Sequence, residues 1–550
     1  MKDLILKYTL INAIDYDGQA SLQSVIGKMI AERPELKSKI KEMIPEIKKT
    51  INEVNSWGLK KQKERLKKLG IIIEKKDEKK VLPELPDAKM GKVITAFPPE
   101  PSKYPHIGHA KAALINYLYA KKYRGKFILR FEDTNPELAK EEYYKAIIDG
   151  LKWLKIKWNK IDYLSDHIKK FYKIAEVLIK RDKAYVCLCK QEQIKKNRFE
   201  KRECACRRFD KKKNMKLWKD MQKKMKPGRA TLRLKIDMSH INTTMRDPSI
   251  FRIIDARHTR TENKYRVWPM YDFANSLMDS FEHITHRIRS KEFEIRKELH
   301  VYIQKLLGYK PPHITEIGRF NLKGVPSSGR QIREMIKNKE LIGWDDPRLT
   351  TLVALKRRGF HPEAIKNFLI STGISKAEGV LTWDVLEAEN RKVIDSIANR
   401  YFGVLDPVKI SIKNAPKLKY IKTNNHPDFP KRGKRKIVVD VRKIYIERDD
   451  YENFKGKEIR LIGLFNIRLN EISEFTGNEI MDVQKIHWVS EPNIKVNIIM
   501  PNGSAIKALA EPSVKDLKIN QNIQLIRIGF CRVDCVKNIK METVLYFTHK

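Results

Sequence analysis

Cysteine, acidic residues and long apolar runs are all scarce in this 550-residue chain. Six cysteines are too few for a disulfide scaffold in a chain of this length, which favours a reducing compartment and a cytoplasmic protein. No stretch approaches the length of a membrane span, which needs about 18 uninterrupted apolar residues. The first residues, MKDLILKYTLINAIDYDGQ, carry Lys7 inside their apolar run and no small-residue cleavage site, so we expect neither a signal peptide nor a membrane segment.

The shortage of acidic residues leaves 114 lysines and arginines against 68 aspartates and glutamates, a formal net charge of +46. A positive field of this size favours a polyanionic partner, and nucleic acid is the first candidate. The alternative is a lysine-rich composition in which lysine stands wherever a surface residue is tolerated. Apolar residues make up 41% of the chain, enough to build several cores, so a wholly disordered chain is excluded.

The chain divides into four parts of different character. Its first part has apolar residues at helical spacing among lysines, and the second alternates strands and helices around a basic, cysteine-bearing insertion. A mostly helical part follows, and the last part consists of short β-branched runs separated by turn residues, typical of barrels or sandwiches. We therefore predict a helical basic module at residues 1–90 and an α/β catalytic domain at residues 91–322, with an insertion at about 187–265. A helical subdomain at residues 323–400 and a β-barrel region at residues 401–550 follow.

Residues 92–131 have the pattern of a strand–helix–strand unit. KVITAF is a short apolar strand, HAKAALINYLYAKKY has helical spacing, and KFILRF is a second strand that ends at Glu132 and Asp133. The loop between the first strand and the helix contains four prolines, which fix its backbone. Because ligands of parallel sheets bind beyond the carboxyl ends of the strands, we expect the loop and the acidic pair to share one site.

His106 and His109 stand where this helix begins. A helix N-terminus presents unpaired N–H groups and a partial positive charge, which suit a phosphate group. Two imidazoles add donors without a permanent charge, and Gly108 lets a flat group such as adenine approach the backbone. The pattern predicts that ATP is held by its phosphates; a proline-rich loop with two incidental histidines is the alternative.

The segment AFPPEPSKYPHIGHAKAALI resembles the HIGH signature of class I aminoacyl-tRNA synthetases, in the archaeal and eukaryotic form of the glutamyl and glutaminyl branch. Similar segments follow in family order over about residues 90–535, among them LRFEDTNPE, WPMYDFA, HITHRIRSKEF, IGWDDPRL and RLIGLFNIRLN. The resemblance implies a Rossmann-like catalytic domain with an acceptor-binding insertion, a helical subdomain and C-terminal anticodon-binding β-barrels. It also implies that an amino acid is activated with ATP and Mg²⁺ and transferred to tRNA.

Arg289 is the position that separates glutamate from glutamine in this resemblance. Glutamyl enzymes have an arginine there that faces the substrate side-chain carboxylate, and glutaminyl enzymes typically lack it. A guanidinium suits a second carboxylate, whereas a neutral amide would leave the charge unpaired, at a cost of about 1–3 kcal/mol. The alternative for Arg289 is a solvated arginine beside Arg287. The resemblance further implies that Glu132 receives the substrate ammonium and that Tyr271 and Asn275 belong to the amino-acid site.

The same resemblance assigns ATP to the proline-rich loop and the start of the helix, and catalysis to the two histidines and a second, KMSKS-like loop. In that second loop a lysine for the pyrophosphate is expected just before GWDDPRL, but the chain reads GVPSSGRQIRE. Ser328 stands at the expected lysine, and Arg330 is the nearest cation. The implied ATP-binding residues are Pro98, Pro99, His106, Ile107, Gly108 and His109.

Two further positions depart from the family pattern. Ala96 stands where an arginine usually helps to bind glutamate, and Lys103 occupies a glycine position. We expect an enzyme that joins L-glutamate to tRNA(Glu), with tRNA(Gln) as a further candidate acceptor. Two alternatives remain: a glutaminyl enzyme, against which Arg289 argues, and a catalytically weakened tRNA-binding protein, which Ala96 and Ser328 would explain.

Four of the cysteines form the pattern C-x-C-x14-C-x-C. Paired thiolates at this spacing in a reducing compartment favour a tetrahedral structural Zn²⁺, and the glutamyl family often has a zinc knuckle in its acceptor-binding insertion. Reduced thiols or a relic site are the alternative. The four candidate ligands are Cys187, Cys189, Cys204 and Cys206.

Two basic runs, residues 195–216 and 429–436, are candidates for tRNA contacts. Such charges bind phosphate and make the affinity depend on salt, but they specify no base. The alternative for each run is a solvated lysine-rich loop.

Overall fold

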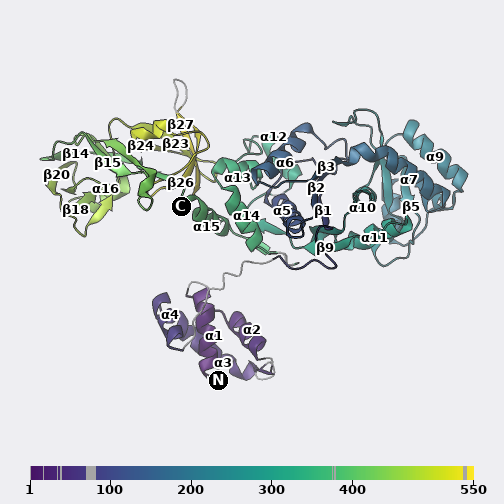
Figure 1. Ribbon diagram of the computed structural model, residues 1–550, viewed down its shortest axis with the longest axis horizontal. Helices are drawn as coiled ribbons and strands as arrows, with labels where there is room; N and C mark the ends of the chain where they lie inside the picture. The colour runs from purple at the N-terminus through teal and green to yellow at the C-terminus, as the bar shows by residue number, and fades with distance from the viewer. Residues whose placement is uncertain are drawn as a thin grey trace. The chain divides into compact units, whose positions relative to one another are not determined.

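A computed structural model describes residues 2–15, 18–33, 35–36, 40–69, 82–326, 328–373, 376, 379–536 and 542–550. The chain forms two compact units, Met1–Val81 and Leu82–Lys550, and each is described by itself (Figure 1). Within the described part of the chain, no helix combines the length and the apolar character needed to cross a membrane.

The first unit is built from helices. Ile47 and Ile51, which helical spacing predicts to face the same way, are both buried in its core. The buried Gln62 Nε2 donates to Val54 O at 2.8 Å and to Trp57 O at 3.0 Å, so one amide ties the last helix to the end of the third. The helices are α1 (Lys2–Asp15), α2 (Leu22–Glu32), α3 (Ile40–Asn55) and α4 (Leu59–Lys68).

The second unit begins with a parallel sheet in the order β1-β2-β3. β1 (Ile94–Phe97) pairs with β2 (Lys126–Phe131), and α5 (Ile107–Lys122) connects them, which confirms the predicted strand–helix–strand unit and the α/β fold class. All residues of β2 after Lys126 are buried, as expected for a central strand covered on both faces. β3 (Lys160–Tyr163) completes the sheet after α6 (Glu141–Trp153).

β8 (His286–Ser290) adjoins the free edge of β1. Thr285, the residue before β8, donates its backbone N–H to Ile94 O at 3.0 Å, and its hydroxyl accepts from Ile94 N at 2.9 Å. β8 also pairs in parallel with β9 (His313–Ile317). Segments almost 200 residues apart in the chain therefore lie side by side.

The predicted insertion forms an antiparallel sheet in the order β4-β5-β6-β7. Trp218 and Trp268 are fully buried in the core between this sheet and its helices. The elements of this region are α7 (Ile168–Lys180), β4 (Ala184–Cys187), α8 (Gln191–Phe199), α9 (Lys211–Lys223), β5 (Thr231–Leu234), β6 (Ser249–Ile253), β7 (Val267–Pro269), α10 (Tyr271–Phe281) and α11 (Lys297–Leu306).

A helical region follows, in which one short pair of strands is parallel. Its elements are β10 (Phe320–Leu322), α12 (Gly329–Lys337), α13 (Leu352–Arg358), α14 (Pro362–Ser371), β11 (Gly379–Leu381) and α15 (Trp383–Ile394).

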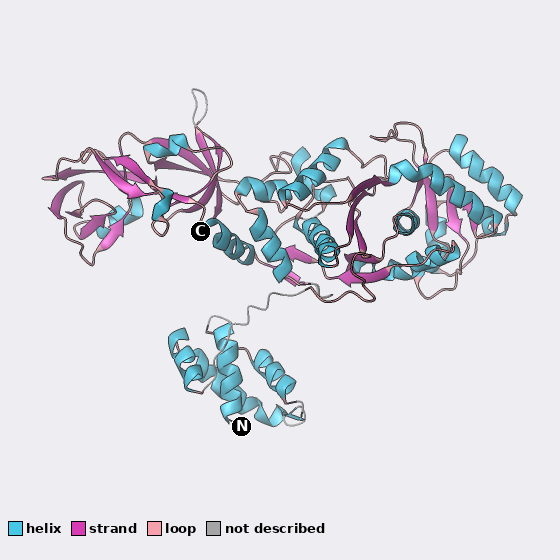
Figure 2. Cartoon of the chain, viewed as in Figure 1, coloured by secondary structure: helices cyan, strands magenta, loops and turns pink. Residues whose placement is uncertain are grey.

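Strands dominate the chain beyond residue 398 (Figure 2). They form two seven-stranded sheets, each with its own apolar core, and a two-stranded hairpin of β15 and β16. The first sheet contains β12 (Asn399–Tyr401), β25 (Asn522–Leu525), β26 (Gly529–Cys535), β27 (Thr543–His549), β23 (Ile494–Ile499), β24 (Ala505–Ala510) and β13 (Gly403–Leu405). The second contains β21 (Gln484–Ile486), β18 (Glu458–Leu461), β19 (Asn466–Arg468), β20 (Ile472–Gly477), β14 (Pro407–Lys413), β17 (Ile444–Glu447) and β22 (Val489–Ser490). The remaining elements are β15 (Tyr420–Asn424), β16 (Lys434–Val438) and α16 (Arg448–Phe454).

Candidate active site

A cavity of about 480 Å³ opens at the carboxyl end of β1. The loop after β1, the first turn of α5, the residues that follow β2, and β8 all line it. This is the edge at which parallel sheets bind their ligands. Most of the predicted site residues line the cavity: Pro98, Pro99, His106, Ile107, Gly108, His109, Glu132, Tyr271 and Arg289.

His106 and His109 cap the start of α5 reciprocally. His106 Nδ1 accepts from Gly108 N at 3.0 Å, and His109 Nδ1 accepts from His106 N at 3.2 Å. Burial lowers the pKa of His106 to about 3 and that of His109 well below its ordinary value. Both rings are therefore neutral, and because each Nδ1 acts as an acceptor, each ring carries its proton on Nε2. The start of α5 thus offers two uncharged N–H donors.

Position 108 has to be glycine because the His106 ring that caps α5 lies against it. A Cβ atom at Gly108 would lie 2.8 Å from His106 Cε1, closer than side-chain contacts allow. Any larger residue would push the His106 ring away and break the cap.

Glu132 follows β2 and faces the proline-rich loop. Its backbone N–H donates to Pro99 O at 3.0 Å, which ties the end of β2 to that loop. Burial raises the pKa of Glu132 to about 8, and the Glu100 carboxylate acts in the same direction. The free carboxyl group is thus mostly protonated at neutral pH and gains a charge when a cation binds beside it. Such a group suits an ammonium ligand.

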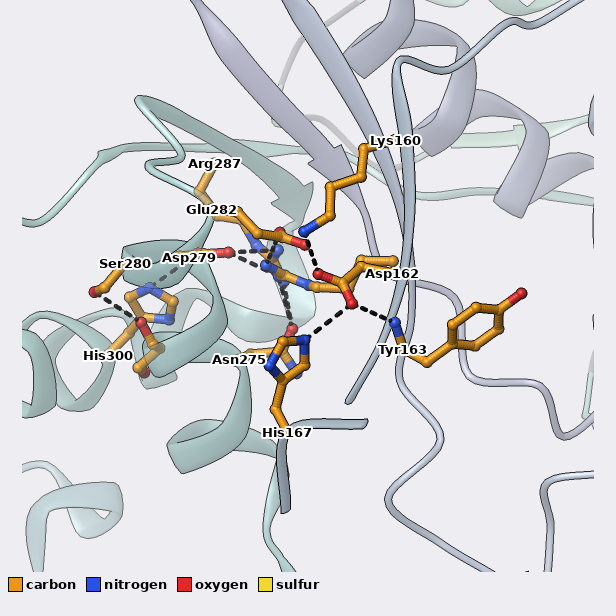
Figure 3. A network of polar contacts seen from close by, with 12 residues as sticks. Lys160, Asp162, Tyr163, His167, Asn275, Asp279, Ser280, Glu282, Arg287 and His300 are labelled. Atoms are coloured by element: carbon orange, nitrogen blue, oxygen red, sulfur yellow. Dashed lines mark hydrogen bonds and ion pairs between the residues drawn. The ribbon is translucent and has the colours of Figure 1, made fainter. Parts of the chain in front are cut away.

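A buried network of charged and polar side chains joins α10 to β8 (Figure 3), and one of its members, Arg287, also lines the cavity. Asp279 Oδ1 accepts from Arg130 Nη2 at 2.7 Å and from Arg287 Nη1 at 3.2 Å, while Glu282 accepts from Arg130 Nη1 at 2.7 Å. Burial acts to raise the pKa of Asp279, but the guanidinia of Arg287 and Arg130 outweigh it and hold that pKa below its ordinary value. Asn275, a predicted site residue, does not line the cavity: its Oδ1 accepts from Arg130 Nη2 at 3.2 Å and from Arg287 Nη2 at 3.1 Å.

Arg289 lies two residues beyond Arg287 and lines the cavity. It is only 6% exposed, and its Nε and Nη2 atoms have no hydrogen-bond partner among the described residues. Burial, together with the neighbouring Arg287, lowers its pKa. A buried guanidinium without a partner is costly until a ligand supplies an anion, and a carboxylate matches its geometry.

Ala96, one of the departures from the family pattern, does not line the cavity. It is fully buried in β1 and packs with Ile128 and Ile284. The position therefore contributes to the apolar side of the sheet and leaves the binding of carboxylates to other residues.

Ser328 and Arg330 also lie outside the cavity lining. Ser328 caps α12, where its hydroxyl accepts from a backbone N–H of the helix at 3.5 Å, and both residues are exposed. Leu322 and Val325 are the described residues of β10 and of the loop after it that line the cavity. The described residues of this second loop therefore bring apolar contacts, and no charge, into the cavity.

Five cations that sequence reasoning did not assign line the cavity as well, among them Arg287, whose partners are described above. The sequence marks Lys103 only as a departure from the family pattern. Lys111 lies three residues after Gly108 on the same helix face, so helical spacing was a signal that could have found it. The other two, Arg252 and Arg319, come from distant strands and loops and carry no local signal.

The four clustered cysteines meet beside β4. Cys187 and Cys204 have their Sγ atoms 3.7 Å apart, and all four Sγ atoms lie within 4.8 Å of one another. Leu188 N donates to Cys206 Sγ at 3.4 Å, and Arg233 Nη1 lies 3.9 Å from Cys187 Sγ. Four sulfurs with nearby positive groups suit a tetrahedral divalent metal, because bound thiolates carry excess negative charge.

Comparisons with known proteins agree with this architecture. Residues 92–396 match the family described as tRNA synthetases class I (E and Q), catalytic domain, and residues 398–487 and 485–534 match its anti-codon binding domains. Over its whole length the chain is 40% identical to a glutamate–tRNA ligase of Pyrococcus furiosus, covering 100% of that protein. It is 42% identical to one of Nitrosopumilus maritimus and 41% identical to one of Pyrococcus abyssi, again along its whole length, with 99% of each of those proteins covered.

Proposed function

The chain belongs to the class I family of tRNA synthetases for glutamate and glutamine, and we infer that it is a glutamate–tRNA ligase. The reaction has two steps. A carboxylate oxygen of glutamate attacks the α-phosphorus of ATP, and pyrophosphate leaves to give glutamyl-adenylate. A hydroxyl group of the terminal ribose of tRNA then takes the glutamyl group, and AMP leaves.

The choice of glutamate rests on Arg289, whose buried Nε and Nη2 atoms have no hydrogen-bond partner among the described residues. The side-chain carboxylate of glutamate would pair with it inside the cavity. The neutral amide of glutamine would leave the cation without a counter-charge, which costs about 1–3 kcal/mol, or roughly 10–100-fold in specificity.

The other residues of the cavity divide between the two substrates. Glu132 receives the ammonium group of glutamate and Tyr271 forms a wall of its pocket. Asn275 holds Arg287, which also lines the cavity, in place. The ring of Tyr271 stacks on Phe293, with centroids 5.0 Å apart, which fixes its position.

ATP binds as its Mg²⁺ complex at the start of α5, next to Pro98, Pro99 and Ile107. The ion supplies charge neutralisation on the phosphates. The Nε2–H groups of His106 and His109 donate to phosphate oxygens, and Gly108 admits the adenine. These groups position the reactants and stabilise developing charge without forming a covalent intermediate.

Ser328 and Arg330 complete the catalytic set in this proposal, from the second loop. Because neither lines the cavity, the first turn of α12 has to move towards the phosphates before they can contact pyrophosphate.

We propose that Cys187, Cys189, Cys204 and Cys206 hold a structural Zn²⁺, whose chemistry here is to cross-link the end of β4 to the turn after α8. Zinc binding requires that the four cysteines are reduced, not joined in disulfides, and this fits a cytoplasmic protein. Residues 187–265 then form a rigid platform for the acceptor end of tRNA.

The proposed RNA partner is tRNA(Glu), with tRNA(Gln) as a further candidate acceptor. The β-barrel region at residues 401–550 is the proposed anticodon-binding part, consistent with the two family matches there. Lys431, Lys434 and Lys436 of the second basic run are exposed and available to phosphates.

Pyrophosphate exchange into ATP, measured with glutamate or glutamine and with or without each tRNA, tests the proposal. We expect exchange with glutamate. Exchange with glutamine alone would identify a glutaminyl enzyme, and tRNA binding without any exchange would identify a weakened tRNA-binding protein.

A further inference from the structure

Lys103 lies between the two segments that approach ATP in the proposed function. It belongs to the loop between β1 and α5 and lines the cavity together with His106 and His109. On its other side it contacts the start of α12: a Cβ atom at Gly329 would lie 2.8 Å from Lys103 Cδ and 3.3 Å from Lys103 Cβ. The aliphatic part of the side chain is therefore held against the backbone of the second loop.

The ammonium group of Lys103 has neither a hydrogen bond nor an ion pair with any residue that the structure describes. Burial lowers the pKa of Lys103; the Glu100 carboxylate opposes this shift, whereas Arg319 and Arg333 add to it. A half-buried cation among other cations is stabilised by a ligand with several negative charges.

The neighbouring cations are already engaged. Arg319 Nη1 pairs with Glu292 Oε2 at 2.5 Å, and Arg333 Nη1 donates to Ser102 O at 2.7 Å. The two histidine rings are neutral, and the second loop places no charged residue in the described cavity lining. Among Lys103, Arg319 and Arg333, Lys103 is therefore the cation whose charge has no partner among the described residues.

We propose that Lys103 is a further catalytic residue, whose ammonium group contacts the polyphosphate of ATP and stabilises the charge that develops on the departing pyrophosphate. This inference rests on the proposed function. In the step, the bond between the glutamate oxygen and the α-phosphorus forms, and the bond from the α-phosphorus to the bridging oxygen breaks. The electron pair of the broken bond leaves with pyrophosphate, and Lys103 stays protonated and transfers no proton.

Pyrophosphate exchange at saturating glutamate, with and without tRNA, tests this role in four proteins: wild type, Lys103→Met, Lys103→Arg and Lys323→Gln. Lys103→Met keeps the aliphatic contact with Gly329 and removes only the charge. We expect it to reduce kcat/KM for ATP and to raise KM for pyrophosphate about 10–150-fold, the effect of one charge-assisted hydrogen bond, with glutamate affinity unchanged. Lys103→Arg should retain most of the activity. Lys323→Gln, an exposed lysine near the second loop that does not line the cavity, should match wild type.

Thermal unfolding curves of the four proteins show whether each is folded, and the response of Lys103→Arg remains informative even if Lys103→Met unfolds. Wild-type kinetics in Lys103→Met would overturn the inference and leave the proposed function intact. A lack of glutamate-dependent exchange in the wild-type protein would instead overturn the proposed function.

Discussion

Arg287 and Arg289 lie on the same side of β8 and are both buried, yet only Arg287 has partners on α10. Arg287 donates to Asp279 at 3.2 Å and to Asn275 at 3.1 Å. Arg289 Nε and Nη2 have no partner among the described residues. Because residues two apart on a strand point the same way, one strand supplies a structural guanidinium and, next to it, one that awaits a ligand.

This difference predicts opposite effects of the same substitution. Arg289→Met should lower kcat/KM for glutamate about 100-fold or more, because it removes the counter-charge of a buried carboxylate. Its free energy of unfolding should stay near that of wild type or rise, because the substitution removes an unpaired buried cation. Arg287→Met should lower the free energy of unfolding by roughly 3 kcal/mol, because it removes one of the two guanidinia that compensate the buried Asp279 carboxylate.

Glutamate-dependent exchange and urea unfolding of both variants provide the measurements. Equal destabilisation by the two substitutions would show that Arg289 is structural, and the specificity argument would then fail.

Glu132 predicts how glutamate binding depends on pH. Burial raises the pKa of Glu132 to about 8, so at neutral pH the free carboxyl group carries a proton that must leave when the substrate ammonium binds. KM for glutamate should therefore fall as the pH rises from about 6.5 towards 8, and binding at neutral pH should release close to one proton. His106 adds no inflection in this range, because its pKa lies near 3.

Calorimetry in buffers of different ionisation enthalpy counts the released protons. Glu132→Gln should bind glutamate weakly, and without proton release. A wild-type KM that is constant over this pH range would contradict the assignment.

The local sequence pattern was enough to predict where the cavity lies, but not to identify all the residues that line it. Glu132 directly follows β2, and His106 and His109 stand at the start of the helix that follows β1, so chain order alone puts them at one edge of a parallel sheet. Asn275 has the right neighbours in sequence, yet it does not line the cavity, and its amide oxygen accepts from Arg287 and Arg130, which no spacing rule reveals. The contact of Lys103 with the start of α12 joins two segments far apart in the chain, so it depends on tertiary packing that the sequence does not display.

Zinc binding by the four cysteines can be tested by metal analysis. The purified chain should contain about one zinc ion, and a Cys187→Ser/Cys204→Ser variant should contain none, because two thiolates do not hold a structural zinc. Removing the metal with a chelator should lower Tm, since a ligand bound only to the native state stabilises that state.

Cys535→Ser is a matched control, because Cys535 lies on β26, outside the cluster, and should leave the metal content unchanged. Equal zinc in the wild type and the double variant would rule out this site.

The basic run at residues 195–216 contains two kinds of cation, and they should respond differently to substitution. Arg207 Nε donates to Asp247 Oδ2 at 2.7 Å, so this residue serves the fold of the insertion. Lys211 and Lys212 at the start of α9 are exposed and free to contact phosphate. Lys211→Ala/Lys212→Ala should weaken tRNA binding and reduce the slope of log Kd against log salt by roughly one per lost contact.

Filter binding of tRNA over a series of salt concentrations measures that slope, with Lys121→Ala/Lys126→Ala, two exposed lysines outside the insertion, as the control. Glutamate-dependent exchange of pyrophosphate into ATP should be unaffected in Lys211→Ala/Lys212→Ala, because neither lysine lines the active-site cavity. An unchanged slope together with unchanged affinity would mean that these lysines are solvated surface residues, and the tRNA platform would have to lie elsewhere on the chain.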